Sequence, residues 1–241
     1  MEILKKSTRL HLPDCLRLTA MALMIFYHFS YDLVFFRYLY FDIMTEPFWW
    51  FLPRLIVFLF LFTMGWSLHL VHAQKIHWQK FFKRFLKIAS AALSISIVTY
   101  LLFPDRWIYF GTLHCIALSS FGTLLVLKHP RLSLFLGLAL LISSMFGHNI
   151  PWIKLPHAAM DHVELFPWIG ASFLGNAMAY YYPKLTTLQR FEHLRIFQSP
   201  SWEFGQKISE HSLFIYLVHQ PILFGIFYTI NLVFSRFHIP N

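Results

Sequence analysis

Long apolar runs separated by short polar segments dominate the sequence. Seven runs are long enough, or nearly so, to cross a hydrocarbon core of about 30 Å as helices. They cover residues 14–36, 48–71, 85–103, 112–127, 132–147, 166–182 and 212–235. The fourth and fifth runs are short, so a tilted hairpin or a half-span is an alternative there. The pattern predicts an all-α, polytopic integral membrane helix bundle with about seven transmembrane helices. No linker or low-complexity tract divides it, so residues 1–241 are expected to form a single domain.

The composition supports a membrane location. Mean hydropathy is +0.54, and 57% of the residues are hydrophobic while only 13% are charged. Soluble domains are far more polar. The longest polar interval, Lys184 to Glu210, is predicted to lie on the inner surface as an interfacial helix or as a cover over a ligand entrance.

The distribution of lysine and arginine predicts the orientation. With the N-terminus in the cytoplasm, 15 of the 20 basic residues fall inside and five fall outside or in the outer half, as the positive-inside rule requires. The inner set is Lys5, Lys6, Arg9, Arg17, Lys75, Lys80, Lys83, Arg84, Lys87, Lys128, Arg131, Lys184, Arg190, Arg195 and Lys207. The outer set is Arg37, Arg54, Arg106, Lys154 and Arg236. The net charge of +9 therefore reflects topology and contact with membrane lipid, and no nucleic-acid partner is expected.

Three ionisable residues interrupt the first apolar run. At 100° per residue, Arg17, His28 and Asp32 share one helical face. Ionisable groups at membrane depth are expensive, so they normally face a protein interior or a wet cavity. His28 is a candidate general base, and Asp32 one turn away would orient its ring. Two alternatives stay open: a buried His28 bonded to the backbone or to a tyrosine, and a structural bridge between Asp32 and Arg54.

Other polar residues are predicted in the outer layer. Tyr100, His114 and the segment Gly147-His148-Asn149 would complete a polar pocket there. Asp161 lies in the outer loop before Trp168, and Arg54 lies at a depth similar to that of Asp32. We consider His114 as a catalytic residue and Arg54, Tyr100, Asp161 and Trp168 as substrate-binding residues. The alternatives are a packing role for His114 and a solvated loop charge for Asp161.

Candidates for binding an anionic cofactor lie toward the inner side. Lys83 and Arg84 belong to a basic, aromatic segment at residues 75–87, which could equally be a surface anchor. His219 would lie about 10 Å deep in the last helix, where it could line a cofactor path. It could instead help to satisfy the backbone broken by Pro221. No histidine or cysteine spacing is typical of a metal site, so no metal is expected.

Several motifs, in order along the chain, resemble the catalytic domain of the heparan-alpha-glucosaminide N-acetyltransferase family and its bacterial relatives, within the wider transmembrane acyltransferase group. They include Pro13-Asp14-Cys15-Leu16-Arg17, Phe26-Tyr27-His28-Phe29, Phe110-Gly111-Thr112-Leu113-His114, Leu165-Phe166-Pro167-Trp168-Ile169-Gly170 and Val218-His219-Gln220-Pro221. Leu18 stands where the family usually has glycine, and Glu164 where it has proline.

The resemblance implies transfer of an acetyl or similar acyl group from cytoplasmic acetyl-CoA to an amine or hydroxyl of a glycan-like acceptor outside. It implies a bacterial inner membrane location, with Arg17 near the inner mouth contacting the cofactor or holding the helix. The chain is shorter than most full-length members, so it is a minimal core or needs a partner such as a second copy in a homo-oligomer. The main rival is a proton-coupled small-molecule transporter, since the same buried residues could relay protons; a non-catalytic scaffold is third.

Overall fold

The computed structural model describes residues 10–43, 45–148, 150–185 and 190–237, and side chains up to residue 234. Lys5, Lys6, Arg9 and the Arg236 side chain, which entered the orientation argument, and Asn149 of the predicted outer pocket lie outside the described residues. Seven apolar helices form in the described part: α1 (His11–Phe35), α2 (Pro47–His72), α3 (Trp78–Leu102), α4 (Thr112–Val126), α5 (Pro130–Met145), α6 (Ile169–Tyr181) and α9 (Ser212–Phe237).

The all-α prediction is confirmed for the described residues, which contain helices and no strand. Four helices, α1, α2, α3 and α9, are long and apolar enough to cross a membrane. The helices α4, α5 and α6 have 15, 16 and 13 residues. Their shortness agrees with the short fourth and fifth apolar runs, and the count of seven spans and the cytoplasmic N-terminus stay predictions.

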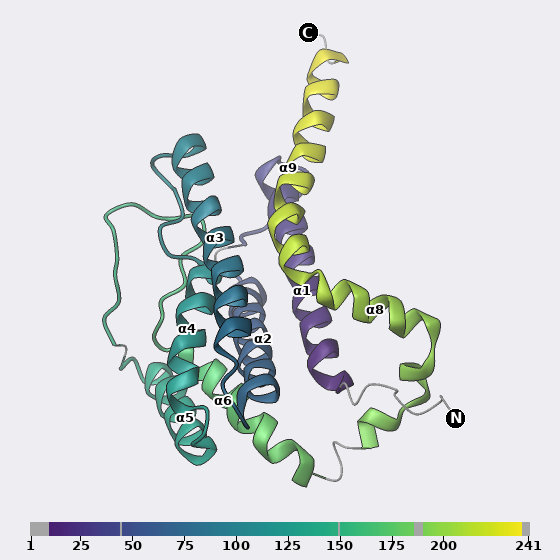
Figure 1. Cartoon of the computed structure of the whole chain (residues 1–241). Coiled ribbons are helices and arrows are strands. Elements are labelled where there is room, and N and C mark those ends of the chain that lie inside the picture. The colour runs from purple at the N-terminus through teal and green to yellow at the C-terminus, as the bar shows by residue number, and fades with distance from the viewer. Residues whose placement is uncertain (1–9, 44, 149, 186–189, 238–241) are drawn as a thin grey trace.

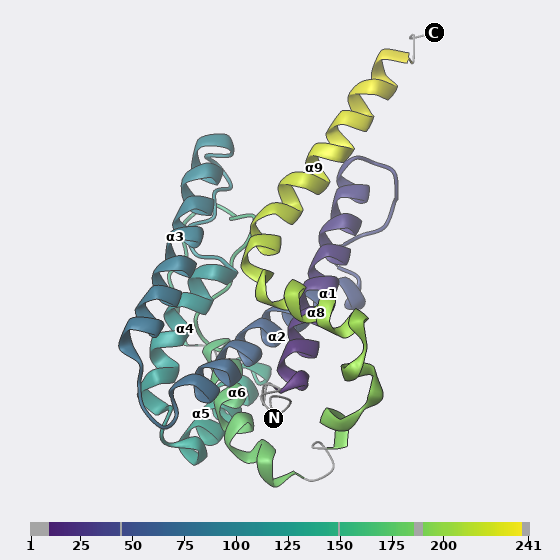
Figure 2. The same cartoon turned by 45° about the vertical axis from the view of Figure 1, so that its right-hand side comes forward.

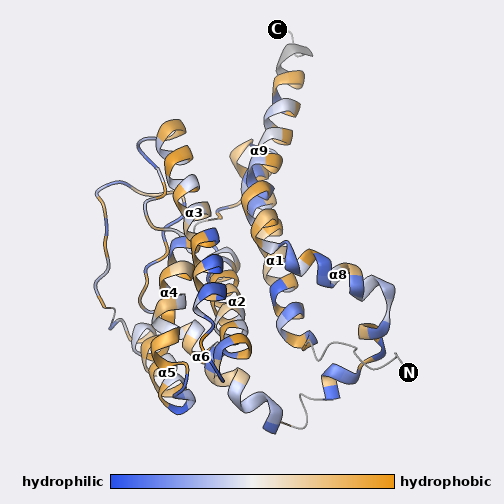
Figure 3. Ribbon diagram, viewed as in Figure 1, coloured by the Kyte–Doolittle hydropathy of each residue, from blue (hydrophilic) through white to orange (hydrophobic). Residues whose placement is uncertain are grey.

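Two segments differ in detail from the predicted pattern. Helix α3 begins at Trp78, so the basic, aromatic segment 75–87 continues into a long helix rather than forming a separate surface element. In its described residues, the interval after α6 contains the short 3-10 turns η1 (Tyr182–Lys184), η2 (Arg190–His193) and η3 (Arg195–Gln198), before the amphipathic helix α8 (Pro200–Glu210). Hydrophilic residues concentrate on α8 and the first turns of α3 (Figure 3).

The helices are arranged in two groups (Figure 1). Helices α2, α4, α5 and α6 pack together, with α3 against α4; α1 packs against α2 and carries α9 and α8 on its other side. We call the first four the helix block. Figure 2 shows that α9 extends beyond the block beside α1. The candidate functional site lies where α9 meets α1, so its geometry depends on the packing of these two helices.

Glycines set the closest contact inside the block. A Cβ on Gly175 of α6 would lie 1.9 Å from the Phe62 carbonyl oxygen of α2, and a Cβ on Gly65 would lie 1.9 Å from the Ser172 carbonyl oxygen. No side chain fits at these positions without moving backbone. Small residues of this kind let membrane helices approach closely, and they make α2 and α6 a rigid support for α1.

Candidate functional site

The main candidate site lies between α1 and α9. It contains His28 and Asp32 on α1, and His219 and Gln220 on α9, and we call these four residues the α1–α9 seam. The two α1 residues are one turn apart on the same face, as the sequence predicts. Because α1 packs directly on α9, that face meets the polar step His219-Gln220 in an otherwise apolar helix.

The two histidine rings of the seam face each other. The ring centroids of His28 and His219 are 4.9 Å apart, with the planes inclined by 60°. The His28 ring is half-buried and makes no hydrogen bond to any other described residue. This leaves the His28 ring nitrogens open to a reacting molecule, which is the first geometric requirement for a general base.

The His219 ring is held by its own helix. Its Nδ1 lies 2.8 Å from the Tyr216 carbonyl oxygen, so Nδ1 carries the proton and donates it. Pro221 lacks the amide that would continue the helical ladder. The Nε2 atom is buried and has no hydrogen-bond partner in the described part of the chain. The carbonyl that Pro221 leaves without a donor is that of Leu217, so the bond to Tyr216 does not satisfy it, and the ring faces the seam.

Asp32 is fully buried and is held from α9. Gln220 Nε2 donates to Asp32 Oδ1 at 3.0 Å. No hydrogen bond joins Asp32 to His28 in the described part of the chain, so the expected orientation of the His28 ring by Asp32 is not observed there. Asp32 Oδ2 and Gln220 Oε1 are buried without partners in the described residues. Buried polar atoms are normally paired, so these unsatisfied atoms mark a place that a ligand or water would complete.

The inner end of α1 carries a second polar cluster. The Arg17 guanidinium donates to Ser209 Oγ at 3.1 Å and to Ser67 Oγ at 2.7 Å, and lies 3.4 Å from Asp14 Oδ1. Ser209 Oγ also donates to Asp14 Oδ1 at 2.8 Å. This network ties α1 to α2 and α8. It favours the predicted alternative that Arg17 holds the helix.

The remaining inner candidates lie on α3. Lys83 and Arg84 are exposed, and Arg84 is near enough to Arg17 for their charges to repel. Arg84 has no hydrogen-bond or ion-pair partner among the described residues. Unlike Arg17, it is therefore available to an anionic group.

The outer candidates form a connected cap at the start of α4. Asp161 Oδ2 accepts from the Thr112 amide at 2.9 Å, and Asp161 Oδ1 lies 3.3 Å from Thr112 Oγ1. Partial burial raises the pKa of Asp161, and the Thr112 hydrogen bonds offset this in part. A carboxylate at a helix N-terminus is also favoured by the helix dipole. A Cβ at Gly111 would lie 2.4 Å from Asp161 Oδ2, so a larger residue there would displace the Asp161 carboxylate.

The His114 ring uses both nitrogens within the protein. Its Nδ1 accepts from the Gly111 amide at 3.1 Å, so its Nε2 carries the proton and donates to Ser96 Oγ at 3.1 Å. Ser96 Oγ in turn donates to the Ile108 carbonyl. This arrangement favours the packing alternative for His114, which joins the start of α4 to α3.

The other predicted substrate residues are not gathered at the seam. The Arg54 side chain lies over the Trp50 ring at 3.7 Å and donates to the Trp50 carbonyl, so the alternative bridge between Arg54 and Asp32 is not made. Tyr100 is exposed and its ring packs against Trp107. Trp168 is half-buried against the main core.

Sequence reasoning missed the partners across helices. It placed His219 about 10 Å from the inner face on a cofactor path, whereas the contact with His28 puts both rings at one level of the bundle, and it overlooked Gln220, Ser67 and Ser209. The available signal was the pair of adjacent polar residues His219-Gln220 in an apolar run. Their partners depend on the packing of α9 on α1, which the pattern alone does not give.

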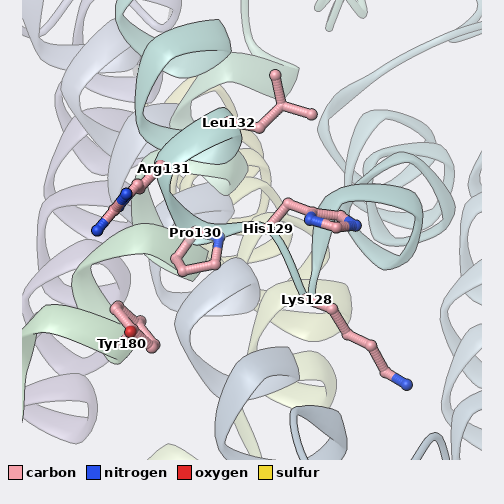
Figure 4. A pocket seen from close by; sticks show the side chains of 6 residues that line it. All are labelled: Lys128, His129, Pro130, Arg131, Leu132 and Tyr180. Atoms are coloured by element: carbon pink, nitrogen blue, oxygen red, sulfur yellow. The ribbon is translucent and has the colours of Figure 1, made fainter.

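Two cavities lie away from the seam. One of about 370 Å³ is lined by Lys128, His129, Pro130, Arg131, Leu132 and Tyr180. Figure 4 shows Arg131 and Tyr180 on one side of Pro130, with His129 and Lys128 on the other. The second, of about 650 Å³, also includes Tyr180 and runs along the end of α2. Neither includes a predicted site residue. Among the described residues, no group of three or more histidine, cysteine or acidic side chains could hold a metal ion.

The fold and the seam define an integral, multi-pass membrane protein with a histidine-containing polar site between two of its helices. Residues 9–221 match the family described as heparan-alpha-glucosaminide N-acetyltransferase, catalytic. The match covers most of the chain, so the chain belongs to this family, and the resemblance found in its motifs is confirmed. Membership supports a membrane acetyltransferase-like function in general. Comparisons with curated proteins and with solved structures gave no match.

Proposed function

We propose that this protein transfers an acetyl or similar acyl group from cytoplasmic acetyl-CoA to an amine or hydroxyl of a glycan-like acceptor on the outer side of a bacterial inner membrane. The observation that carries the proposal is the α1–α9 seam, where two histidine rings meet beside unsatisfied buried polar atoms within the family's catalytic region. The proposal includes seven membrane passages and a cytoplasmic N-terminus.

The depth of His28 suits this transfer. From His11 to His28 the helix rises over 17 residues, about 26 Å at 1.5 Å per residue. With the N-terminus inside, His28 lies in the outer half of the membrane. An acceptor from outside could then meet a thioester that reaches up from the cytoplasmic side.

His28 acts as the general base in this proposal. Its ring nitrogens take the proton from the acceptor amine or hydroxyl as the oxygen or nitrogen attacks the thioester carbonyl carbon. A positioned base of this kind contributes about 10²–10⁴-fold. Asp32 acts from α1 through Gln220 of α9 and so keeps the two helices in register at the seam.

The donor would enter past the inner cluster. Arg84 and Lys83 are free to contact the phosphates of the nucleotide, while Arg17 holds α1 against α2 and α8 beside them. Guanidinium groups bind phosphate in a bidentate manner. On the outer side, Arg54, Tyr100, Asp161 and Trp168 remain our candidates for the acceptor site, with the exposed Arg54 and Tyr100 the most accessible.

The test is incubation of the purified protein in lipid with radiolabelled acetyl-CoA and a panel of amino sugars and glycans. We expect release of coenzyme A together with labelling of an acceptor, and loss of both in His28→Ala. His211→Ala is the matched control, because His211 is an exposed histidine at the inner end of the same bundle.

The proposal fails if folded wild-type protein labels no acceptor across a broad panel. The same seam would then favour the rival function, a proton-coupled small-molecule transporter, because paired imidazoles beside a buried carboxylate can relay protons. Proton-dependent substrate uptake into vesicles would establish that reading.

A further inference from the structure

His219 has the geometry of a second reacting group. Its Nδ1 is committed to the Tyr216 carbonyl, which fixes the ring and directs the only remaining nitrogen, Nε2, away from the helix backbone. Nε2 is buried and has no partner among the described residues. The ring lies against that of His28, with no third side chain between two rings whose centroids are 4.9 Å apart.

The geometry points to His219 as the general acid of the transfer, charged as an imidazolium that keeps its Nδ1–H bond to Tyr216 while Nε2–H gives its proton to the sulfur of the departing coenzyme A. This inference rests on the proposed function. It adds a catalytic residue that the proposal lacks, since His28 alone accounts only for the proton that leaves the acceptor.

The proton balance explains why two imidazoles are useful. The acceptor nitrogen or oxygen forms a bond to the carbonyl carbon, its proton passes to His28, and the carbon–sulfur bond breaks. The sulfur takes the electron pair of that bond and a proton from His219. The proton on His28 then passes to His219, which restores both rings. The net reaction gives the acetylated acceptor and coenzyme A thiol, with no proton exchanged with the solvent.

The buried setting makes the second proton important. A thiolate released beside a buried carboxylate and far from water would be an unpaired charge in an apolar region, which is costly. Protonation of the sulfur as it departs avoids that charge. Because the acceptor proton reaches His28 as His219 gives its own proton to the sulfur, the pair carries one excess proton throughout, and the two facing rings are not cationic together, which charge repulsion would oppose.

The other titratable groups that face the seam make hydrogen bonds, although Asp32 Oδ2 has no partner among the described residues. Asp32 accepts from Gln220 on α9, and the Tyr216 hydroxyl is hydrogen-bonded to the Thr112 side chain of α4. Arg17 is occupied by Ser67 and Ser209 at the inner end. The hydrogen bond from Nδ1 to the Tyr216 carbonyl fixes the orientation of the His219 ring and therefore the direction of Nε2.

The test compares two acetyl donors. Acetyl-CoA releases an alkyl thiol, whereas the acetyl thioester of 4-nitrothiophenol releases a much more acidic thiol that departs without a proton. Each donor is offered with the same acceptor to wild type, His219→Asn and His28→Asn, and acetylated acceptor is measured. Asparagine keeps an amide N–H near the position of Nδ1, so the bond to Tyr216 can persist while Nε2 is removed.

We expect His219→Asn to lose about 10²-fold in rate with acetyl-CoA and less than about tenfold with the activated donor. His28→Asn should lose comparably with both donors, because the acceptor must be deprotonated in either case. His211→Asn is the matched control. His211 Nδ1 also contacts a carbonyl of its own helix, that of Lys207 at 2.8 Å, but the ring is exposed, and we expect wild-type rates.

Equal losses with both donors, or no loss with either, would overturn the acid role and leave His219 as a packing residue. If His219→Asn does not fold, wild type gives the answer through its rates in mixtures of H₂O and D₂O. A plot of rate against the deuterium fraction of the solvent that is curved for acetyl-CoA and linear for the activated donor supports the transfer of two protons with acetyl-CoA. Plots of the same shape for both donors refute it. Wild type inactive with acetyl-CoA would instead refute the proposed function itself.

Discussion

The hydrogen-bonded networks of the helix block and the α1–α9 seam both bury polar side chains, but they treat them differently, although the block also buries the Trp66 indole N–H without a partner in the described residues. In the block, Asn176 donates to Ser133 Oγ at 2.7 Å and accepts from His69 Nδ1 at the same distance. Thr123 and Ser172 are paired at 2.8 Å. In the seam, Asp32 Oδ2, His219 Nε2 and Gln220 Oε1 are equally buried and have no partner among the described residues.

This difference distinguishes polar side chains that hold helices together from polar side chains that are available to react. A satisfied network fixes helix positions, and its members lose their function only when the packing fails. Unsatisfied buried groups lower stability, so a protein that keeps them gains something else at that place. The outer cap formed by Asp161, Thr112 and His114 behaves like the block, although the sequence placed two of these residues among the site candidates.

The largest expected effect breaks the block. In Gly175→Ala the new Cβ would meet the Phe62 carbonyl oxygen at 1.9 Å, so α2 and α6 must separate. We expect a loss of about 3 kcal/mol in the free energy of unfolding, measured by denaturant titration in mixed detergent micelles. Activity per folded molecule should change little.

Gly225→Ala is the matched control for this change. Gly225 lies in α9 with no heavy atom within 4 Å of its would-be Cβ, so alanine there should raise helix stability slightly. Equal destabilisation by both substitutions would show that the close approach of α2 and α6 is not what holds the block.

A second change removes the central amide of the block. Asn176→Leu leaves Ser133 and the His69 ring without their partner in a fully buried position. We expect a loss of about 2 kcal/mol in unfolding free energy, followed by the same titration. Thr229→Val on α9 is the control, since that exposed hydroxyl bonds only to its own helix at Gly225. Wild-type stability of Asn176→Leu would contradict the distinction between block and seam.

The sequence predicts the block better than the seam. Apolar runs mark the helices to within a few residues, because burial in lipid requires both apolar side chains and internally bonded backbone. One-face arguments also place His28 and Asp32 together. The pairing of His28 with His219, and of Asp32 with Gln220, depends on the rotation of α9 about its axis. The hydrophobic periodicity gives no information on that rotation, because nearly 190 residues of chain separate the paired positions.

In the outer cap, the sequence predicts a functional site where the structure shows hydrogen bonds to the backbone. His114 and Asp161 have the residue types of a catalytic site, and their chemistry alone made them candidates. Their partners are backbone groups at the start of α4, namely the amides of Gly111 and Thr112. Reasoning from the sequence considers side chains as partners of other side chains, so it underestimates how often the hydrogen-bond partner is a backbone amide.

A third prediction tests the seam through Asp32. Asp32→Asn keeps an oxygen to accept from Gln220 and removes the charge from a fully buried site. We expect unfolding free energy to rise by about 1 kcal/mol, because burying an unpaired charged oxygen is unfavourable. Acetyl transfer should fall by about tenfold, because a hydrogen bond between neutral groups is weaker and holds α1 and α9 less firmly in register at the seam. Unchanged transfer would remove Asp32 from the site.

The smallest expected effect concerns pH and the outer cap. Burial raises the pKa of Asp161 above its ordinary value of 3.8, so the folded protein holds this proton more tightly than the unfolded chain does. The stability that this provides is complete below about pH 4 and is lost as the pH rises through the folded pKa. In Asp161→Asn the Thr112 amide keeps an acceptor while the titration disappears.

Unfolding free energy measured from pH 4 to 7 should therefore fall more steeply for wild type than for Asp161→Asn, with the two curves closest at low pH. Asp105→Asn, which removes an exposed loop carboxylate, is the control and should follow wild type. Parallel curves for wild type and Asp161→Asn would mean that the Thr112 hydrogen bonds fully compensate for burial. In that case the charge of Asp161 would stabilise the start of α4, and Asp161 would be a fully hydrogen-bonded structural residue like those of the block.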